Sequence, residues 1–311
     1  MSVRRGIAML SGVLLLSAGC ASMKAPGGIP GVVAPGVAAE LVQQGYVFTE
    51  GPLGTPDGGL YFTDLRTANR IYRLDPRGTI SVFRENSEGT NGLAFTSKGE
   101  LVGAEGAGKR ISRIAADGKP TELTRGDGER LLMAPNDLIV DVKGGIYFTD
   151  PGPRPVVPGR KAYVYYLPAG TSKAVALDDS IVRPNGLILT LDGKTLIVAD
   201  TVGDTLFAFD VRSDGTVTNK RAFARLRDIA AGMESGADGV ALDREGRLYV
   251  TTFTGVQVFD KAGQYLGTIA VPRQPSNVAF AGPGKRTLYI TAREGVYRVE
   301  TLTAGPERLG K

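Results

Sequence analysis

Short apolar runs alternate with turns rich in Gly, Pro and Asp along most of the chain. Residues 134–150 give the clearest example. The polar pair Asn136-Asp137 precedes an apolar run, Gly144-Gly145 follows, and a second apolar run ends in Thr-Asp. Two β-strands joined by a tight turn produce this pattern. A short buried helix would accommodate the apolar residues, but the glycine pair and the β-branched and aromatic residues after it favour strands.

The same pattern recurs six times, and each copy begins at a polar residue that we call an anchor. The anchors are Glu50, Asn91, Asn136, Asn185, Asp238 and Asn277, and subtracting their numbers gives spacings of 39 to 53 residues. A period of this length, with several short strands in each unit, is typical of a β-propeller. We therefore predict an all-β fold, a six-bladed β-propeller with four-stranded blades.

The sixth unit contains only three clear strands, whereas residues 39–44 precede the first unit and belong to no blade. We expect this N-terminal strand to close the last blade, because pairing there removes an open sheet edge. Residues 38–303 then form one propeller domain, and 304–311 form a C-terminal tail. Residues 21–37 carry three prolines among glycines and are predicted to be a flexible tether.

The N-terminus has the features of a secretory signal. Arg4-Arg5 precede an apolar stretch, 6–19, that is too short to span a bilayer comfortably. Its end, Leu-Ser-Ala-Gly-Cys20, resembles the lipobox of bacterial lipoproteins, and Cys20 is the only cysteine. We expect residues 1–20 to be a lipoprotein signal with lipidation at Cys20, and Ala21 favours anchoring in the outer membrane, facing the periplasm. The alternative is simple cleavage, which would release a soluble periplasmic protein.

Composition excludes several classes of function. The formal charge of +5 is scattered through turns, so we expect no nucleic-acid partner. Residues 103–109 match the start of a P-loop, but Arg110 replaces the Ser or Thr that would bind magnesium, so we expect no nucleotide. The chain has no histidine, which rules out a Ser-His-Asp triad and histidine-ligated metals. Any metal must be held by oxygen, which selects hard cations.

The anchors offer such oxygens. Because the innermost strand of each blade lines the central channel, we expect all six anchors to converge on one mouth of that channel. Two carboxylates, Glu50 and Asp238, about 4 Å apart would repel by roughly 4 kcal/mol at an effective dielectric near 20. A divalent cation would turn that repulsion into attraction. Alternatively, an Asn before Gly is an ordinary turn residue, and we favour that interpretation for Asn91 and Asn277.

Four of these motifs resemble one known family. Glu50-Gly-Pro, Pro135-Asn-Asp, Arg183-Pro-Asn-Gly and Ala237-Asp-Gly are similar to motifs of the SMP-30/gluconolactonase (regucalcin-like, LRE-like region) propellers, and the likeness covers about residues 45–298. The resemblance implies a calcium-dependent lactone hydrolase with one divalent ion in the channel mouth. Ca²⁺ is then the expected ion, with Mg²⁺, Mn²⁺ or Zn²⁺ as substitutes.

Matched position by position, Glu50, Asn185 and Asp238 correspond to the family's metal ligands. Asn136 corresponds to a fourth residue that binds the ion or the substrate. The more distant paraoxonases use histidine for proton transfer. This chain has no histidine, so that mechanism is not available to it.

The expected reaction is hydrolysis of a small-molecule lactone by a metal-activated water. Asp238 is the first candidate for the general base and Asp137 the second, although Asp137 could equally bond backbone in its turn. The proline-rich insertion 151–160 could be a lid that brings Arg154, Arg160 or Tyr163 to the substrate, or a structural excursion. We expect a monomer.

Two other functional classes remain open from the sequence. One is a non-catalytic propeller of the bacterial envelope that binds a ligand or protein at the same mouth. The other is a strictosidine-synthase-like enzyme with different chemistry. Lactone hydrolysis that requires a divalent cation would distinguish the lactone-hydrolase interpretation from both of these classes.

Overall fold

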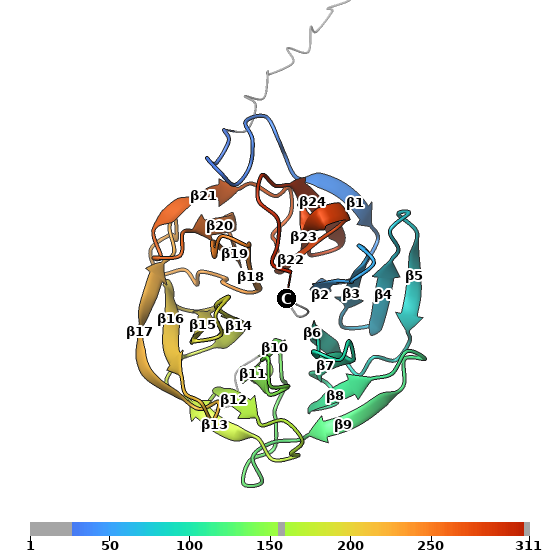
Figure 1. Ribbon diagram of the computed structural model, residues 1–311, viewed down its shortest axis with the longest axis vertical. Coiled ribbons are helices and arrows are strands. Elements are labelled where there is room, and N and C mark those ends of the chain that lie inside the picture. The colour runs from blue at the N-terminus through green and yellow to red at the C-terminus, as the bar shows by residue number, and fades with distance from the viewer. Residues whose placement is uncertain (1–26, 155–158, 308–311) are drawn as a thin grey trace, which may run out of the picture.

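The computed structural model describes residues 27–154 and 159–307 of the chain. This part folds into six four-stranded antiparallel sheets that stand as blades around a central axis (Figure 1). The predicted six-bladed propeller is confirmed. The described residues contain a single helix, the three-residue 3₁₀ turn η1 (Pro283–Lys285). Among the same residues, no helix is both long enough and apolar enough to span a membrane.

Each blade is an antiparallel meander whose first strand is innermost. Blade 1 contains β2 (Thr49–Gly54), β3 (Leu60–Asp64), β4 (Arg70–Leu74) and β5 (Ile80–Arg84). Blade 2 contains β6 (Thr90–Phe95), β7 (Leu101–Glu105), β8 (Arg110–Ile114) and β9 (Pro120–Thr124). Blade 3 contains β10 (Leu138–Val140), β11 (Ile146–Asp150), β12 (Tyr163–Leu167) and β13 (Val175–Asp178).

The remaining blades follow the same order. Blade 4 contains β14 (Pro184–Leu189), β15 (Thr195–Asp200), β16 (Thr205–Val211) and β17 (Val217–Arg225). Blade 5 contains β18 (Val240–Leu242), β19 (Leu248–Thr252), β20 (Gly255–Phe259) and β21 (Tyr265–Ile269). Blade 6 contains β22 (Asn277–Ala281), β23 (Thr287–Ala292) and β24 (Gly295–Glu300), and its outermost strand is β1 (Glu40–Gln44).

The N-terminal strand closes the ring as predicted. β1 pairs antiparallel with β24, from Glu40 opposite Arg298 to Gln44 opposite Gly295. An ion pair between Arg298 and Glu40 at 3.2 Å joins the two strands on their exposed side. The pairing covers the edge of blade 6, which would otherwise be open to association with another chain.

The prediction of a flexible tether is wrong for residues 27–37. Ile29, Val32 and Val33 are buried and pack into the hydrophobic cluster of blades 5 and 6. The amide of Leu302 also donates to the Val32 carbonyl at 2.8 Å, which joins the two ends of the described chain. Apolar side chains among the prolines and glycines find cover there, and this burial opposes the flexibility that composition suggested. The predicted signal and Cys20 lie outside the described residues.

The predicted boundary of the C-terminal tail is also displaced. Ala304 is buried, its carbonyl accepts from the amide of Arg244 at 2.9 Å, and Lys285 Nζ donates to the Pro306 carbonyl at 2.7 Å. The chain therefore remains part of the domain beyond residue 303, because these polar contacts and the burial of Ala304 hold it against blades 5 and 6.

The hydrophobic core is divided among the interfaces between blades. Between blades 1 and 2, for example, Leu53, Ile71, Leu93, Phe95 and Leu101 form one cluster. Each blade packs both of its faces against neighbouring blades, so alternate side chains of one strand are buried against different blades. This distribution explains how a chain of this length folds without a single large core.

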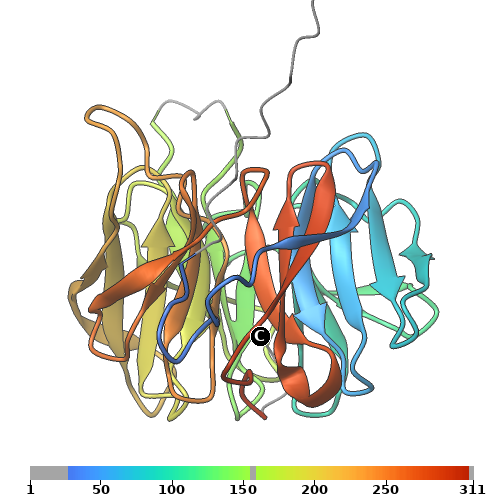
Figure 2. The same ribbon diagram turned by 90° about the horizontal axis from the view of Figure 1, so that it is seen from above.

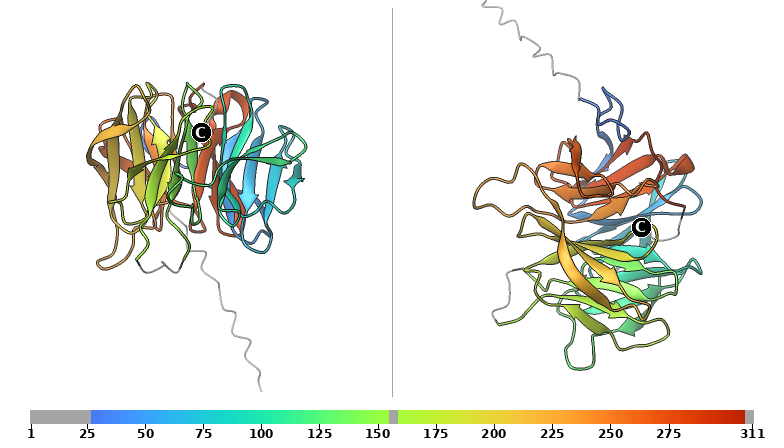
Figure 3. Two further views of the ribbon diagram at one scale, coloured as in Figure 1. Left: turned by 90° about the horizontal axis from the view of Figure 1, so that it is seen from below. Right: turned by 60° about the vertical axis from the view of Figure 1, so that its left-hand side comes forward.

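All innermost strands begin at one face of the ring, which we call the anchor face. The loops that follow β11 and β17 rise from this face, as the side views show (Figures 2 and 3). The hairpin turns between first and second strands, and residues 301–307, lie at the opposite face. The topology therefore gathers the six anchors at one end of the channel.

Candidate active site

The six anchors occupy equivalent places in the six blades. Glu50, Asn91, Asn185 and Asn277 lie at the beginning of β2, β6, β14 and β22, and Asn136 and Asp238 lie two residues before β10 and β18. The expected convergence on one end of the channel follows from this placement.

Hydrogen bonds between neighbouring blades join the anchor segments into a closed ring. The bonds are Thr63 Oγ1 to Asn91 O at 3.2 Å, Gly92 N to Asn136 O at 2.8 Å, Thr149 Oγ1 to Asn185 O at 2.8 Å, Gly186 N to Asp238 O at 3.1 Å, Gly239 N to Ser276 O at 2.8 Å and Ser276 Oγ to Thr49 O at 2.7 Å. Because each bond starts in one blade and ends in the next, the anchors depend on one another for position.

Glycine follows four of the anchors for a steric reason. A Cβ atom on Gly186 would lie 2.1 Å from the Asp238 carbonyl oxygen, and one on Gly239 would lie 1.9 Å from Asn277 Oδ1. Turn chemistry was one explanation for these glycines, but the close approach of the adjacent blade accounts for Gly186 and Gly239 directly. At Gly51 both reasons apply, since φ is +47° and a Cβ would lie 1.9 Å from the Asn91 carbonyl oxygen.

Glu50 is held as a buried carboxylate. Its side chain is 2% exposed, and its Oε2 accepts from the Gly51 amide and from Asn277 Nδ2, both at 3.0 Å. Asn277 in turn accepts the Val278 amide through Oδ1 at 2.9 Å. The expectation that Asn277 satisfies backbone is therefore met, and the residue also orients Glu50.

Three anchor amides present oxygens without a hydrogen-bond partner. Oδ1 of Asn91, Asn136 and Asn185 is buried and accepts no hydrogen bond. Asn185 is 5% exposed, and its Nδ2 donates to Thr201 Oγ1 at 3.0 Å, which leaves Oδ1 as the amide atom without a partner. A buried oxygen without a donor costs free energy, so these three atoms are available to a cation, a water or another donor. Asn91 Oδ1 therefore satisfies no backbone group, in contrast to the interpretation favoured from the sequence.

Asp137 and Asp238 differ in access. Asp137 is fully buried, and its Oδ1 accepts the Leu138 amide at 2.9 Å, which supports its alternative role of bonding backbone. Asp238 is half-buried at the anchor face, so it has the exposure that proton exchange with a bound water requires. The placement favours Asp238 over Asp137 as the general base.

The anchor group fits a hard divalent cation by its chemistry. It provides two carboxylates and three amide oxygens without partners, and oxygen ligands of this kind are those of Ca²⁺ and Mg²⁺ sites. Over residues 27–154 and 159–307, no three His, Cys, Asp or Glu side chains gather as a metal site. The fit depends on asparagine, a residue type that a search for acidic clusters does not count.

Sequence reasoning missed the residues that hold the anchors in place. Asp150 Oδ1 and Oδ2 accept the amides of Ala134 and Met133 at 2.8 and 2.7 Å, which fixes the chain two residues before Asn136. Burial raises the pKa of Asp150 above its ordinary value, while these two amide donors lower it. The Thr-Asp pair that ends β11 also ends β3, and this repeat was a signal in the sequence.

The predicted substrate contacts Arg154 and Tyr163 belong to different surroundings. Tyr163 lies under the Arg130 guanidinium, 5.1 Å from its ring centroid, in a hollow of about 570 Å³ over blade 3 that is lined by none of the anchors. Arg154 Nη2 forms an ion pair with Glu234 Oε2 at 3.0 Å. Arg154 is electrostatically linked to the anchor group through Arg183, whereas no described contact links Tyr163 to it.

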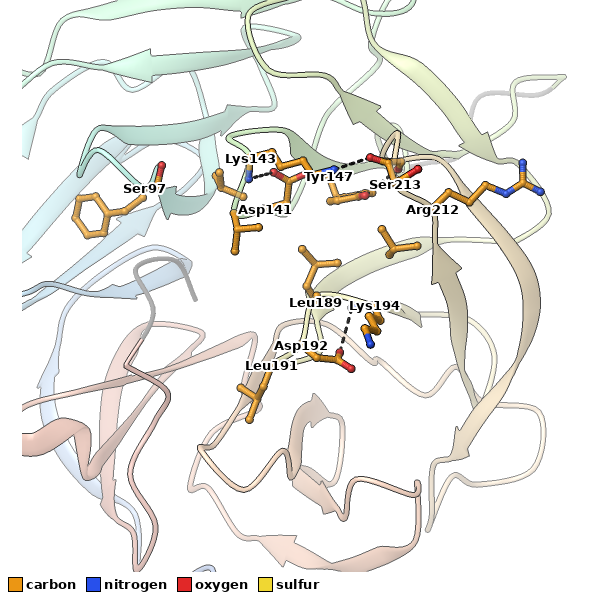
Figure 4. A pocket seen from close by; sticks show the side chains of 16 residues that line it. Ser97, Asp141, Lys143, Tyr147, Leu189, Leu191, Asp192, Lys194, Arg212 and Ser213 are labelled. Carbon is orange, nitrogen blue, oxygen red and sulfur yellow. Dashed lines mark hydrogen bonds between the residues drawn. The ribbon is translucent and has the colours of Figure 1, made fainter.

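A mainly apolar hollow of about 520 Å³ lies away from this chemistry (Figure 4). Its lining includes Tyr147, Leu189 and Leu191, and the hairpin turns 141–145 and 190–195 border it. These turns join first and second strands, so the hollow lies at the face opposite the anchors. Tyr147 Oη donates to the Gly215 carbonyl at 2.8 Å and thereby joins blades 3 and 4. The anchor group and not this apolar hollow is the candidate active site.

Comparison with known proteins identifies relatives across almost the whole domain. The family model described as SMP-30/Gluconolactonase/LRE-like region matches residues 48–294. A gluconolactonase from Zymomonas mobilis is 26% identical, over 86% of this chain and 82% of that protein. A 6-deoxy-6-sulfogluconolactonase from Pseudomonas putida is 30% identical, over 86% of this chain and 90% of that protein.

Solved structures agree with these relatives. A gluconolactonase from Xanthomonas campestris is 33% identical and superposes with a TM-score of 0.77, covering 85% of this chain and 90% of that chain. A protein described as a putative gluconolactonase is 26% identical with a TM-score of 0.79, covering 89% and 97%. The resemblance inferred from the four short motifs is confirmed.

Proposed function

The chain belongs to the SMP-30/gluconolactonase/LRE-like family, and from this premise we propose that it is a divalent-cation-dependent hydrolase that opens a sugar lactone. Relatives named gluconolactonase and sulfogluconolactonase, which align over more than four fifths of this chain, support the lactonase class. The single observation that carries the proposal is the ring of anchors, which combines Glu50 and Asp238 with three buried amide oxygens that accept no hydrogen bond.

Glu50, Asn185 and Asp238 would hold the cation, with Asn136 as a further ligand or substrate contact. When bound, a divalent cation supplies polarisation of a carbonyl and a lower pKa for coordinated water. Ca²⁺ is the ion we expect, since the donors are carboxylate and amide oxygens. The Glu50 carboxylate is held in position because Gly51 N and Asn277 Nδ2 both donate to its Oε2.

The chain itself contributes proton transfer and orientation. Asp238 is the half-buried carboxylate that would accept the proton of the attacking water. Asn136 would orient the lactone through its side-chain amide, because its backbone is fixed by bonds to Thr149 O at 2.9 Å and from Gly92 N at 2.8 Å. Because the backbone is already ordered, positioning Asn136 against the substrate costs less conformational entropy.

A cation and lactone experiment tests the proposal. We expect the purified domain to open sugar lactones, to lose this activity in chelator and to regain it with Ca²⁺. Glu50→Gln should lower kcat/KM by about 100-fold or more, the usual effect of weakening stabilisation of a developing oxyanion. Glu40→Gln is the matched control, because Glu40 lies exposed on the outermost strand of blade 6.

Thermal unfolding gives a second readout that does not need substrate. A ligand at 100 times its Kd stabilises the folded state by about 2.7 kcal/mol, so Ca²⁺ should raise the Tm of the wild type and not of Glu50→Gln. A wild-type domain that binds Ca²⁺ but opens no lactone in a broad panel would instead support a non-catalytic binding propeller.

A further inference from the structure

Arg183 is a charged residue at the anchor face that the proposed reaction does not use. It lies directly before β14 and two residues before Asn185, which places its Cα up to about 7 Å further out along an extended chain. Its side chain is partly buried, and Nη2 donates to the Gly152 carbonyl at 3.3 Å. Within the described part of the chain, no Asp or Glu forms an ion pair with it at 4.0 Å or less.

The charges around Arg183 leave its guanidinium poorly compensated. Asp238, Glu234 and Arg154 are all close enough to interact with it electrostatically. Glu234 is already paired with Arg154 at 3.0 Å. Arg183 itself is partly buried and forms no ion pair within 4.0 Å with either of these described carboxylates. A partly buried cation in this situation gains free energy from any anion that reaches it.

The surroundings of Arg183 come from three blades. Gly152 and Arg154 belong to the loop after β11 in blade 3, Arg183 to blade 4, and Glu234 and Asp238 to the segment that enters blade 5. The loops after β11 and β17 rise from the anchor face (Figure 2). Arg183 therefore lies at one wall of the channel mouth, beside the anchors and outside them.

The geometry points to a substrate class. We propose that Arg183 binds an anionic substituent of the substrate, so that the lactones opened by this protein carry a carboxylate, sulfonate or phosphate away from the reacting carbonyl. This inference rests on the proposed lactone hydrolysis. The planar fork of a guanidinium matches the paired oxygens of such groups and binds them in a defined orientation. Asp238, if engaged with a cation, would leave the positive charge of Arg183 still less balanced.

Kinetics with matched lactones test the assignment. The substrates are neutral glucono-1,5-lactone, a glucarolactone that bears a carboxylate, and 6-phosphogluconolactone. Arg183→Gln should lower kcat/KM for the two anionic lactones by about 10- to 100-fold, mainly through KM, the range for loss of one charge-assisted hydrogen bond. The neutral lactone should change by less than about 2-fold, because it offers no charge to the guanidinium.

Two further variants make the comparison specific. Arg183→Lys keeps the charge without the fork and should lose less than Arg183→Gln on the anionic lactones. Arg77→Gln is the matched control, since the Arg77 side chain is 92% exposed in a turn of blade 1. Equal losses on neutral and anionic lactones would overturn the inference, as would a wild type that prefers the neutral lactone.

A binding measurement separates this inference from the proposed function. In calorimetric titrations, the wild type should bind the open-chain acid 6-phosphogluconate at least about 10-fold more tightly than gluconate, and Arg183→Gln should remove that difference. If no lactone is opened but the difference is present, the lactonase proposal fails and the anion site stands. If lactones are opened and the two acids bind alike, the anion site fails alone.

Discussion

A methyl group at Gly186 should damage the candidate active site without touching any of its side chains. In Gly186→Ala, the new Cβ would lie 2.1 Å from the Asp238 carbonyl oxygen, whereas ordinary contact begins at 3.4 Å. The difference, 3.4 − 2.1 = 1.3 Å, is the displacement that the two blades must share. Gly186 does not have a left-handed φ, so the effect is steric and owes nothing to backbone strain.

The displacement has two costs. Overpacking of this kind destabilises a protein by about 1–3 kcal/mol. The Gly186 N to Asp238 O bond of 3.1 Å would also lengthen, at a cost of about 1 kcal/mol. Because Asp238 is a proposed ligand and base, a shift near 1 Å should also lower kcat/KM by about 100-fold.

Urea unfolding and lactone kinetics measure the two effects. We expect a loss of about 2–4 kcal/mol in the free energy of unfolding, together with the loss of activity. Gly27→Ala is the control, since a Cβ there meets nothing within 4 Å. A Gly186→Ala protein with wild-type stability and activity would refute the argument that close approach of Asp238 selects this glycine.

Three further outcomes follow from the same contacts. Thr149→Val should lower the free energy of unfolding by about 1–3 kcal/mol, measured in urea, because the Asn185 carbonyl loses its 2.8 Å donor, and Thr149→Ser should retain most of it. Burial raises the pKa of Asp150, so the folded state binds the proton of this carboxyl more tightly than the unfolded state does. The stability that Asp150 contributes therefore falls as pH rises through its folded pKa. In a pH series of unfolding curves, the loss of unfolding free energy caused by Asp150→Asn should shrink over that pH range. A chain that begins at residue 38 should have a lower Tm than one that begins at residue 27. Ile29, Val32 and Val33 each bury apolar surface that stabilises the fold by up to about 1.5–3 kcal/mol. Equal Tm values would contradict their packing.

The blades could be predicted because their signals are local and repeated. In the turn between β10 and β11, Asp141 Oδ1 accepts the amides of Lys143 and Gly145 at 2.8 and 2.9 Å, and Gly144 takes a φ of +87°. These demands are met by residue types at fixed offsets, so they are visible in the sequence. Counting the strands in each unit also predicted that a strand before the first blade closes the last one.

The candidate site was predictable only in part. The anchors could be found because the repeat places them at equivalent positions, and Glu50 stood out as a poor turn residue. The sequence could not distinguish Asn91, whose Oδ1 accepts no hydrogen bond, from Asn277, whose Oδ1 accepts the Val278 amide. That difference depends on how each amide is oriented, and for Asn277 the orientation is fixed from another blade, because Nδ2 donates to Glu50 Oε2 of blade 1 at 3.0 Å.

The sequence alone thus determined the repeat, the number of blades, the closure of the ring and the residue types at the channel mouth. The tertiary structure decided which oxygens lack donors, that Ile29, Val32 and Val33 are buried, and that Arg183 of blade 4 interacts electrostatically with Asp238 at the entry to blade 5. The physical reason is range. Turns and strands arise from residues a few positions apart, whereas burial and electrostatic balance arise from segments that are distant in the chain and meet only after folding.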